Sequence, residues 1–155
     1  MILGVGVDII EVERIRGVHE RFGERFLARI LCPKETEYCL SHAHPAPHLA
    51  ARFAAKEAVS KAFGTGIGAE VGWLDIEVVH HESGQPYVIL HGAGGRLLST
   101  RGGTVIHLSL SHTQTYACAV ALIEGASPVP EPNLAPAPTH TPSSLQVGPQ
   151  SLGPS

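Results

Sequence analysis

Four charged side chains lie within one alanine-rich segment of the chain. The segment, residues 47–63, has the apolar spacing of a mostly buried helix. The charged residues in it are Arg52, Lys56, Glu57 and Lys61. A charge withdrawn from water requires a partner or a metal ion, because its desolvation is strongly unfavourable. Glu57 and Lys61 are four positions apart and therefore share a helix face. An acid that could hold a cation thus stands beside a base that could hold an anion, which suits a metal–phosphate ligand.

Asp8 is a second acid in apolar surroundings. Residues 2–10 alternate between an Ile/Gly/Gly/Asp/Ile face and a Leu/Val/Val/Ile face, which predicts a strand. Gly4 and Gly6 leave space on the Asp8 face, either for close packing or for a ligand. If this strand packs on the helix, the carboxylates of Asp8 and Glu57 converge. Hard oxygen ligands of this kind favour Mg²⁺.

Ordinary structural roles are also open for these two acids. Asp8 could cap the helix that follows the strand, as acids at strand ends often do. Glu57 could form a helix-surface ion pair with Lys61, which would contribute little to stability. Neither acid decides between a structural and a metal-binding role when it is taken alone.

His112 and the residues around it form a third candidate group. His112 follows the strand predicted at 105–111, and Ser109, Ser111 and Thr113 place hydroxyls nearby. A histidine can act as a proton carrier near neutral pH. All of these residue types are equally ordinary at the edge or turn of a hairpin, so the pattern leaves both roles open.

The glycine-rich segment 64–68 follows the predicted helix instead of preceding one. A phosphate-binding loop presents its amides at a helix N-terminus, so this segment is better explained as a C-cap that begins at Gly64. A glycine at this point still permits the close approach of a ligand.

A stripe of arginines follows the first strand. Arg14, Arg21, Arg25 and Arg29 are spaced by 7, 4 and 4 residues and would share one face of an unbroken helix. Such a stripe is either a solvated helix face, balanced by neighbouring glutamates, or a docking surface for an acidic partner. Gly23 could break the helix and scatter the stripe. The net charge of −3 argues against a general nucleic-acid-binding protein.

These residues must be positioned by helices and strands, and the order of the expected helices and strands along the chain predicts an α+β domain with a mainly antiparallel sheet. Apolar periodicity and Gly or Pro breaks define these elements. In chain order they are a strand (2–10), a helical region (11–30), a helix that begins at a proline (33–40), the helix at 47–63, a hairpin (73–81 and 86–90), a short helix within 92–103, and a second hairpin (105–111 and 116–123).

Composition limits the expected folded domain to residues 1–125. Residues 126–155 contain eight of the 12 prolines and few large apolar side chains, so we expect a disordered Pro/Ser-rich tail. The 3 cysteines lack a C-x-x-C spacing and fit free thiols in a reducing compartment. The chain contains no apolar run as long as a membrane span and no basic region of a signal peptide, so we expect a cytoplasmic protein.

The histidines at positions 42, 44, 48, 80 and 81 could suggest zinc. The first of them lie in a proline-rich stretch without thiolate spacing. A polar loop is therefore the better explanation for this group.

Three segments of the chain resemble bacterial holo-acyl-carrier-protein synthases, the small 4′-phosphopantetheinyl transferases. These segments are MILGVGVDIIE (1–11), RFAAKEAVSKAFGTGIG (52–68) and LSLSHT (108–113). The resemblance extends from Met1 to about Glu124, and its middle segment is the most specific. The Pro/Ser-rich tail has no counterpart in the family pattern.

The resemblance implies the α+β phosphopantetheinyl transferase fold and a homotrimer with active sites between subunits. It implies transfer of 4′-phosphopantetheine from coenzyme A to a serine of apo acyl carrier protein, with release of adenosine 3′,5′-bisphosphate, in fatty acid biosynthesis. The site residues that the resemblance implies are Asp8 and Glu57 for Mg²⁺; Glu57, Lys61 and His112 for catalysis; Arg52, Lys61, Gly64, His112 and Thr113 for coenzyme A; and Arg14, Arg21 and Arg25 for docking the carrier protein.

Two other functions are consistent with the same residues. One is a different Mg²⁺-dependent phosphoryl-transfer or nucleotide-processing enzyme that uses the same site. The other is a non-enzymatic module that binds acidic proteins through the arginines, although this would leave Asp8 and the helix charges unexplained. The base that would deprotonate the acceptor serine is also open, among Glu57, a metal-bound water and another group.

Overall fold

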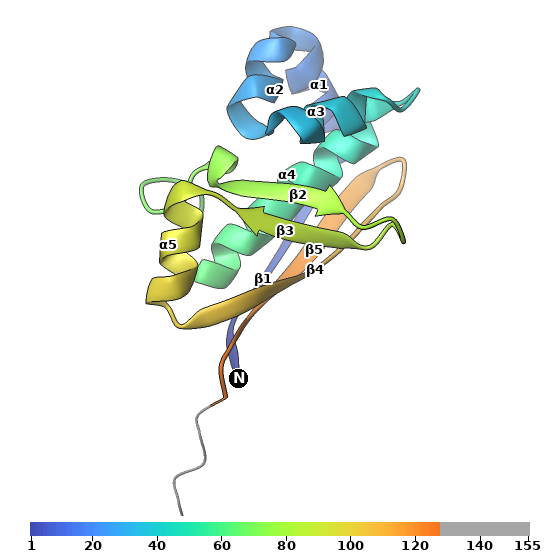
Figure 1. Cartoon of the computed structure of the whole chain (residues 1–155). Coiled ribbons are helices and arrows are strands. Elements are labelled where there is room, and N and C mark those ends of the chain that lie inside the picture. Colours follow the sequence, from blue (N-terminus) through green and yellow to red (C-terminus); the bar gives the residue numbers. More distant parts are fainter. Residues whose placement is uncertain (128–155) are drawn as a thin grey trace, which may run out of the picture.

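Helix α4 (Pro45–Phe63) runs through the middle of the structure, between a three-stranded sheet and a two-stranded hairpin (Figure 1). The structure is a computed structural model, and it describes residues 1–127. The prediction of a disordered tail at 126–155 falls almost entirely outside the described residues and stays a prediction. No helix in the described part of the chain is both long and apolar enough to cross a membrane.

The order of elements gives an α+β domain, which confirms the predicted fold class. The elements in chain order are β1 (Ile2–Glu11), α1 (Val12–Phe22), α2 (Glu24–Ile30), α3 (Pro33–Leu40), α4, the 3-10 turn η1 (Trp73–Asp75), β2 (Ile76–His80), β3 (Pro86–Leu90), α5 (Gly92–Thr100), β4 (Gly103–His112) and β5 (Tyr116–Gly125). Helices α1 to α3 gather at one end of α4 and α5 lies at the other (Figure 1).

The larger sheet has the strand order β1-β5-β4, and both of its pairings are antiparallel. Asp8 of β1 and Leu110 of β4 both lie opposite Ala119 of the central strand β5. Gly4, Gly6, Asp8 and Ile10 form the face of β1 that packs on α4. The other face of β1, with Leu3, Val5, Val7 and Ile9, is exposed in the single chain.

Helix α4 is buried on nearly all sides because sheet strands cover one side and the β2–β3 hairpin covers another. Thirteen of its 19 residues are buried, and seven of these are alanines. Small side chains allow backbones to approach closely, so the alanine-rich composition follows from the packing. Gly64, with a φ of 75°, ends the helix in the left-handed conformation, as the glycine pattern predicted.

The helical region 11–30 is two helices, because Gly23 has a φ of 53° and makes the break that the sequence left open. Other details differ from the sequence predictions. Helix α4 begins at Pro45, two residues before the predicted start, and β2 begins at Ile76 after a 3-10 turn. The strands form two separate sheets of three and two strands.

Lys56 is fully buried in the core and is held by an ion pair that the sequence did not predict. Its Nζ donates to Glu35 Oε2 at 2.7 Å and to the carbonyl oxygens of Ile30 at 2.6 Å and Trp73 at 3.0 Å. Glu35 also accepts the backbone N–H of Val78 at 2.9 Å. This network joins α2, α3, α4, η1 and β2, and it satisfies a charge that would otherwise be buried alone.

Candidate functional site

Close backbone packing brings Asp8 against helix α4. A Cβ placed on Gly6 would lie 1.9 Å from the carbonyl oxygen of Ala58, and one on Gly4 would lie 2.0 Å from that of Ala62. Glycine is therefore required at both positions for β1 to approach the helix this closely. The free space on the Asp8 face serves close packing, which was one of the two roles predicted for the glycines.

The close packing places Asp8 beside Lys61. Lys61 Nζ donates to Asp8 Oδ1 at 2.8 Å and to the carbonyl oxygen of Val7 at 3.1 Å. The Asp8 side chain is 15% exposed and that of Lys61 is 48% exposed. Lys61 thus pairs with Asp8, and the alternative in which Glu57 takes Lys61 as its ion-pair partner does not describe this structure. Helix α1 has no side-chain cap, so Asp8 does not cap it.

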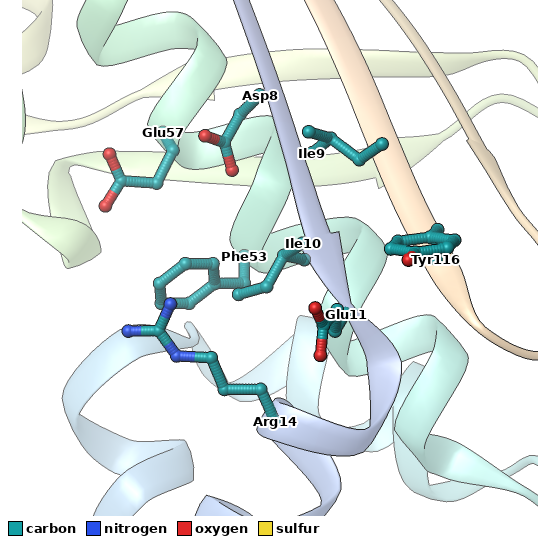
Figure 2. A pocket seen from close by; sticks show the side chains of 8 residues that line it. All are labelled: Asp8, Ile9, Ile10, Glu11, Arg14, Phe53, Glu57 and Tyr116. Atoms are coloured by element: carbon teal, nitrogen blue, oxygen red, sulfur yellow. The ribbon is translucent and has the colours of Figure 1, made fainter.

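Asp8 and Glu57 line one pocket of about 470 Å³. Figure 2 shows their carboxyl groups side by side at one end, with Arg14 from the start of α1 at the other. The remaining lining residues are Ile9, Ile10, Glu11, Phe53 and Tyr116. Strand β1 and helix α4 therefore supply the acids, and α1 supplies a cation.

The pocket raises the pKa of the Glu57 carboxyl above its ordinary value. Burial is the largest cause, the negative charge of Asp8 adds to it, and Lys61 partly opposes it. Two neighbouring carboxylates repel each other when both are ionised, and a cation between them stabilises the ionised pair. The lining residues offer carboxylate oxygens and no thiol or imidazole, so the donor set fits Mg²⁺.

Arg52 lies on a different side of α4. Its guanidinium stacks on the Tyr38 ring at 4.0 Å and its Nη2 is 3.3 Å from His80 Nδ1. The residue is only 2% exposed, and its buried Nε has no hydrogen-bond partner. Arg52 lines a separate pocket that also contains Lys34 and Tyr87. A guanidinium that lines a pocket together with a lysine suits an anionic ligand.

His112 belongs to the same neighbourhood as Arg52. The rings of His112 and His48 are 4.9 Å apart, His48 stacks on His42 at 3.6 Å, and Tyr38 stacks on His80 at 4.9 Å. Burial, together with the charges of His42 and His112, lowers the pKa of His48 to about 4. His48 lies on α4 and His80 on β2, within the helix and the strand that the sequence predicted at those positions.

Helix geometry explains why the predicted residues form two groups. Positions 48 and 52 are one turn apart, as are 57 and 61, but the two pairs are offset by nine residues. Nine residues at about 100° each place the pairs on roughly opposite faces of the helix. The single chain therefore brings together Asp8, Glu57 and Lys61, and separately Arg52 with His112. The spacing of His48 and Arg52 could have revealed the second group from the sequence.

Gly64 and Thr113 have clear structural roles. The backbone N–H of Gly64 donates to the carbonyl oxygen of Lys61 at 2.9 Å, which closes α4. Thr113 Oγ1 accepts the N–H groups of Thr115 at 3.1 Å and Tyr116 at 3.0 Å, which stabilises the β4–β5 turn. Their predicted contacts with coenzyme A stay predictions.

The arginine stripe is divided by the break at Gly23. Arg14 lines the Asp8 pocket, whereas Arg25 and Arg29 line a neighbouring groove with Phe22 and Phe26. Arg21 lies over the Phe22 ring at 5.1 Å. The arginines are exposed and remain available to a partner, although they do not form one continuous helix face.

Comparisons with known proteins agree on one family. Residues 4–121 match the family described as the 4′-phosphopantetheinyl transferase superfamily. The chain is 48% identical over 124 residues to a holo-[acyl-carrier-protein] synthase of Koribacter versatilis, covering 80% of this chain and 99% of that one.

Solved structures give the same result. A holo-[acyl-carrier-protein] synthase from Neisseria meningitidis matches with a TM-score of 0.75 and 36% identity, covering 80% of this chain and 99% of that one. One from Bacillus anthracis, described in complex with CoA (3′,5′-ADP), matches with a TM-score of 0.69 and 38% identity, covering 81% of this chain and 99% of that one.

Proposed function

We propose that this chain, which belongs to the holo-acyl-carrier-protein synthases of the 4′-phosphopantetheinyl transferase superfamily, uses the Asp8 pocket to transfer 4′-phosphopantetheine from coenzyme A to a serine of apo acyl carrier protein. The serine Oγ forms a bond to the β-phosphorus of coenzyme A. The bond from that phosphorus to the bridging oxygen breaks, and adenosine 3′,5′-bisphosphate leaves. The observation that carries the proposal is the meeting of Asp8 and Glu57 at one pocket, with Lys61 paired to Asp8.

Asp8 and Glu57 would hold Mg²⁺, which when bound supplies charge neutralisation to the diphosphate. Lys61, anchored by Asp8, presents an ammonium group that offsets negative charge on the leaving bisphosphate side. Glu57 lines the pocket and is one candidate for accepting the serine proton at a carboxylate oxygen; another group of the site is the alternative.

We assign the group of Arg52 and His112 to the same coenzyme A, through a neighbouring copy of the chain. The Arg52 guanidinium, which lines a pocket with Lys34, suits a phosphate oxygen of the coenzyme. Because this group and the Asp8 group lie on opposite faces of α4, one small ligand could contact both only between two protomers. This geometry supports active sites at subunit interfaces in a homotrimer.

The exposed face of the three-stranded sheet offers a surface for such assembly. Val5, Val7 and Ile9 of β1 are 59%, 63% and 66% exposed, and Tyr116 of β5 is 48% exposed. Apolar side chains gathered on one sheet face are typical of protein interfaces. A cyclic arrangement joins different patches of neighbouring subunits and would therefore allow a site shared between the two groups.

The arginines of the first helices would dock the acidic carrier protein. Arg14 lines the pocket itself, so a partner that contacts it is placed beside Asp8 and Glu57. We expect Arg14→Ala and Arg21→Ala to raise the KM for carrier protein, and more so at low salt, because salt screens such contacts. Arg96→Ala, at an exposed site on α5, is the matched control. A KM that is unchanged at every salt concentration would refute this docking surface.

The direct test is a mass measurement. The full chain is mixed with apo carrier protein, coenzyme A and Mg²⁺, and the mass of the carrier protein is measured by mass spectrometry. The expected result is a gain of one phosphopantetheinyl group together with formation of adenosine 3′,5′-bisphosphate. A second arm contains nucleotides and no carrier protein. Turnover in that arm without any gain of mass in the first would favour a different phosphoryl-transfer enzyme.

A further inference from the structure

A cysteine, a glutamate and a histidine from three different elements meet outside the Asp8 pocket. Cys32 lies at the start of α3, Glu77 on β2 and His91 directly after β3. One possible ligand atom from each lies within 4.8 Å of the other two. Within residues 1–127 this is the one group of three such side chains that meets this distance. No role in the proposed reaction involves any of the three.

The backbone of each residue is anchored. The Cys32 N–H donates to Glu35 Oε2 at 2.8 Å, which fixes the first turn of α3. Glu77 is paired with Ile89 across the hairpin, and the His91 N–H donates to the carbonyl oxygen of Asp75 at 2.9 Å. The three side chains thus project from rigid positions, which favours a formed site over a chance encounter of loops.

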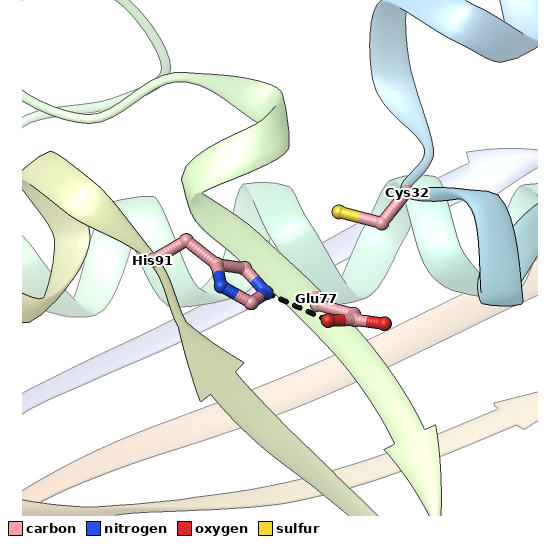
Figure 3. A group of neighbouring side chains, drawn as sticks. All are labelled: Cys32, Glu77 and His91. Carbon is pink, nitrogen blue, oxygen red and sulfur yellow. Dashed lines mark hydrogen bonds and ion pairs between the residues drawn. The ribbon is translucent and has the colours of Figure 1, made fainter.

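The side chains point toward one another. His91 Nε2 and Glu77 Oε2 are 2.6 Å apart, and Figure 3 shows the Cys32 sulfur directed toward this pair from the start of α3. All three line a cavity of about 450 Å³ together with Lys34, Leu74 and Ile89. The Glu77 side chain is 10% exposed and that of His91 is 48% exposed, so the site is closed on one side and open on the other.

We propose that Cys32 Sγ, Glu77 Oε2 and His91 Nε2 bind a Zn²⁺ ion. Sulfur, imidazole nitrogen and carboxylate oxygen are the donors that zinc takes in proteins. Metal–ligand distances of about 2.0 to 2.3 Å leave tetrahedral ligands roughly 3 to 4 Å apart. To reach that range, His91 Nε2 and Glu77 Oε2 must move apart from 2.6 Å, while the Cys32 sulfur already lies within 4.8 Å of both; rotation of the exposed His91 side chain can supply this change. The open side of the cavity leaves a fourth position for water.

Binding must displace the thiol proton. Burial raises the pKa of Cys32 to about 11; the Lys56 charge partly opposes this, and the carboxylates of Glu35 and Glu77 add to it. Zinc affinity therefore increases with pH, since the proton competes with the metal for the sulfur. A bound ion would tie the start of α3 to the β2–β3 hairpin and thereby stabilise the fold.

An ordinary histidine–glutamate hydrogen bond is the competing explanation. The chain supplies a matched control, because His107 and Glu124 form a pair of the same 2.6 Å length. No cysteine belongs to a ligand group with that pair within the described residues. A metal site should therefore depend on His91 and not on His107.

The test is a titration of the metal-free full chain with Co²⁺, followed by displacement with Zn²⁺. We expect one equivalent of Co²⁺ to give a thiolate-to-metal charge-transfer band, which oxygen ligands alone do not produce. Cys32→Ser should abolish the band, and His91→Ala should weaken binding by at least about tenfold. Cys118→Ser and His107→Ala should leave the band unchanged. Zn²⁺ should raise the melting temperature of the unaltered chain and not that of Cys32→Ser.

Three results would overturn the proposal. These are the absence of a thiolate band, a band that survives in Cys32→Ser, and equal affinity in His91→Ala and the unaltered chain. Melting curves without metal check that each variant is folded. Because none of the three residues acts in the proposed transfer reaction, the titration is decided independently of the mass measurement on carrier protein.

Discussion

Asp8 and Glu57 place two negative charges at one partly buried pocket, and the protein stabilises them incompletely. Lys61 pairs with Asp8, but burial and the Asp8 charge still raise the pKa of Glu57. A carboxyl whose pKa is raised by folding is a source of instability once it is ionised. Such a residue is retained where its charge has a task, and binding a cation is the task we propose.

Replacing Glu57 should therefore stabilise the chain while it abolishes transfer. The folded-state pKa lies above the ordinary 4.5, so the free energy of unfolding falls as pH rises from about 4.5 through the folded pKa. In EDTA at pH 7, Glu57→Gln should be more stable than the unaltered chain by less than about 1 kcal/mol, because the side chain is only partly buried and water screens its charge. The difference should vanish below pH 4.5. Urea denaturation measures it.

Glu20→Gln, at an exposed position on α1, is the control and should change stability by less than about 0.5 kcal/mol. If Glu57→Gln were less stable than the unaltered chain at pH 7, the Glu57 charge would not be the unfavourable one that we describe.

Residue types alone identified Asp8, Glu57 and Lys61 as candidate site residues, but they did not predict which side chains form ion pairs. The sequence left open whether Lys61 pairs with Glu57, four positions away, and the structure pairs it with Asp8, which is 53 positions distant. Lys56 likewise finds Glu35 from another helix. Such pairings depend on how elements pack, and helical spacing contains no information about this.

At the scale of elements, the approach of β1 to α4 determines the position of Asp8. A Cβ on Gly6 would lie 1.9 Å from the carbonyl oxygen of Ala58, and backbone cannot move aside as a flexible side chain can. The two elements must separate to admit even a methyl group. Asp8 lies two residues further along the same strand face, so its distance from Lys61 would change as well.

Gly6→Ala should reduce both stability and activity. We expect a loss of about 1 to 3 kcal/mol, as for overpacking of a tight core. Thermal unfolding and the carrier-protein assay measure the two effects. Gly17→Ala is the control, because Gly17 has nothing within 4 Å and lies inside α1. That change should stabilise the chain by about 0.5 to 1 kcal/mol. Equal behaviour of the two variants would contradict the close-packing account.

Lys56→Met tests the network that joins five elements around the core. Removing the ammonium leaves the Glu35 carboxylate buried without its cation, and breaking such a pair destabilises by about 3 to 5 kcal/mol. Chemical denaturation provides the measurement. Lys34→Met, at an exposed position on α3, should stay within about 0.5 kcal/mol of the unaltered chain. A similarly small effect of Lys56→Met would show that the network contributes little.

At the scale of the whole molecule, one chain contains the two halves of the proposed site on opposite faces of α4. Asp8, Glu57 and Lys61 occupy one face, and Arg52 and His112 are found at the other. The outer face of β1 is apolar and exposed in the single chain. Both features are accounted for if copies of the chain assemble around that sheet face.

Val7→Asp should prevent assembly and reduce transfer. Val7 is 63% exposed on the outer face of β1, so the change leaves the core of one chain intact but places a charge in the proposed interface. Light scattering should report a trimer for the unaltered chain and a smaller species for the variant. Leu40→Asp, on α3, is the control, since Leu40 is 47% exposed on another surface. Persistence of the trimer in Val7→Asp would contradict this interface.

The arrangement of elements could be predicted largely from local patterns. Alternation identified β1 and β4, an apolar run identified β5, and the proline at position 33 and the glycines after residue 63 located helix ends. The division of the strands into two sheets could not be predicted, because strand pairing beyond a hairpin is a long-range property. The separation of the site into two groups is long-range in the same way.

The most direct test is the Mg²⁺ dependence of carrier-protein modification, followed by mass for the unaltered chain, Asp8→Ala and Glu57→Ala. We predict no modification in EDTA, saturation of the unaltered chain as Mg²⁺ is added, and a loss on the order of 100-fold or more in each variant. Modification by both variants at the unaltered rate, with the same Mg²⁺ dependence, would contradict the assignment of these two carboxylates to a shared cation.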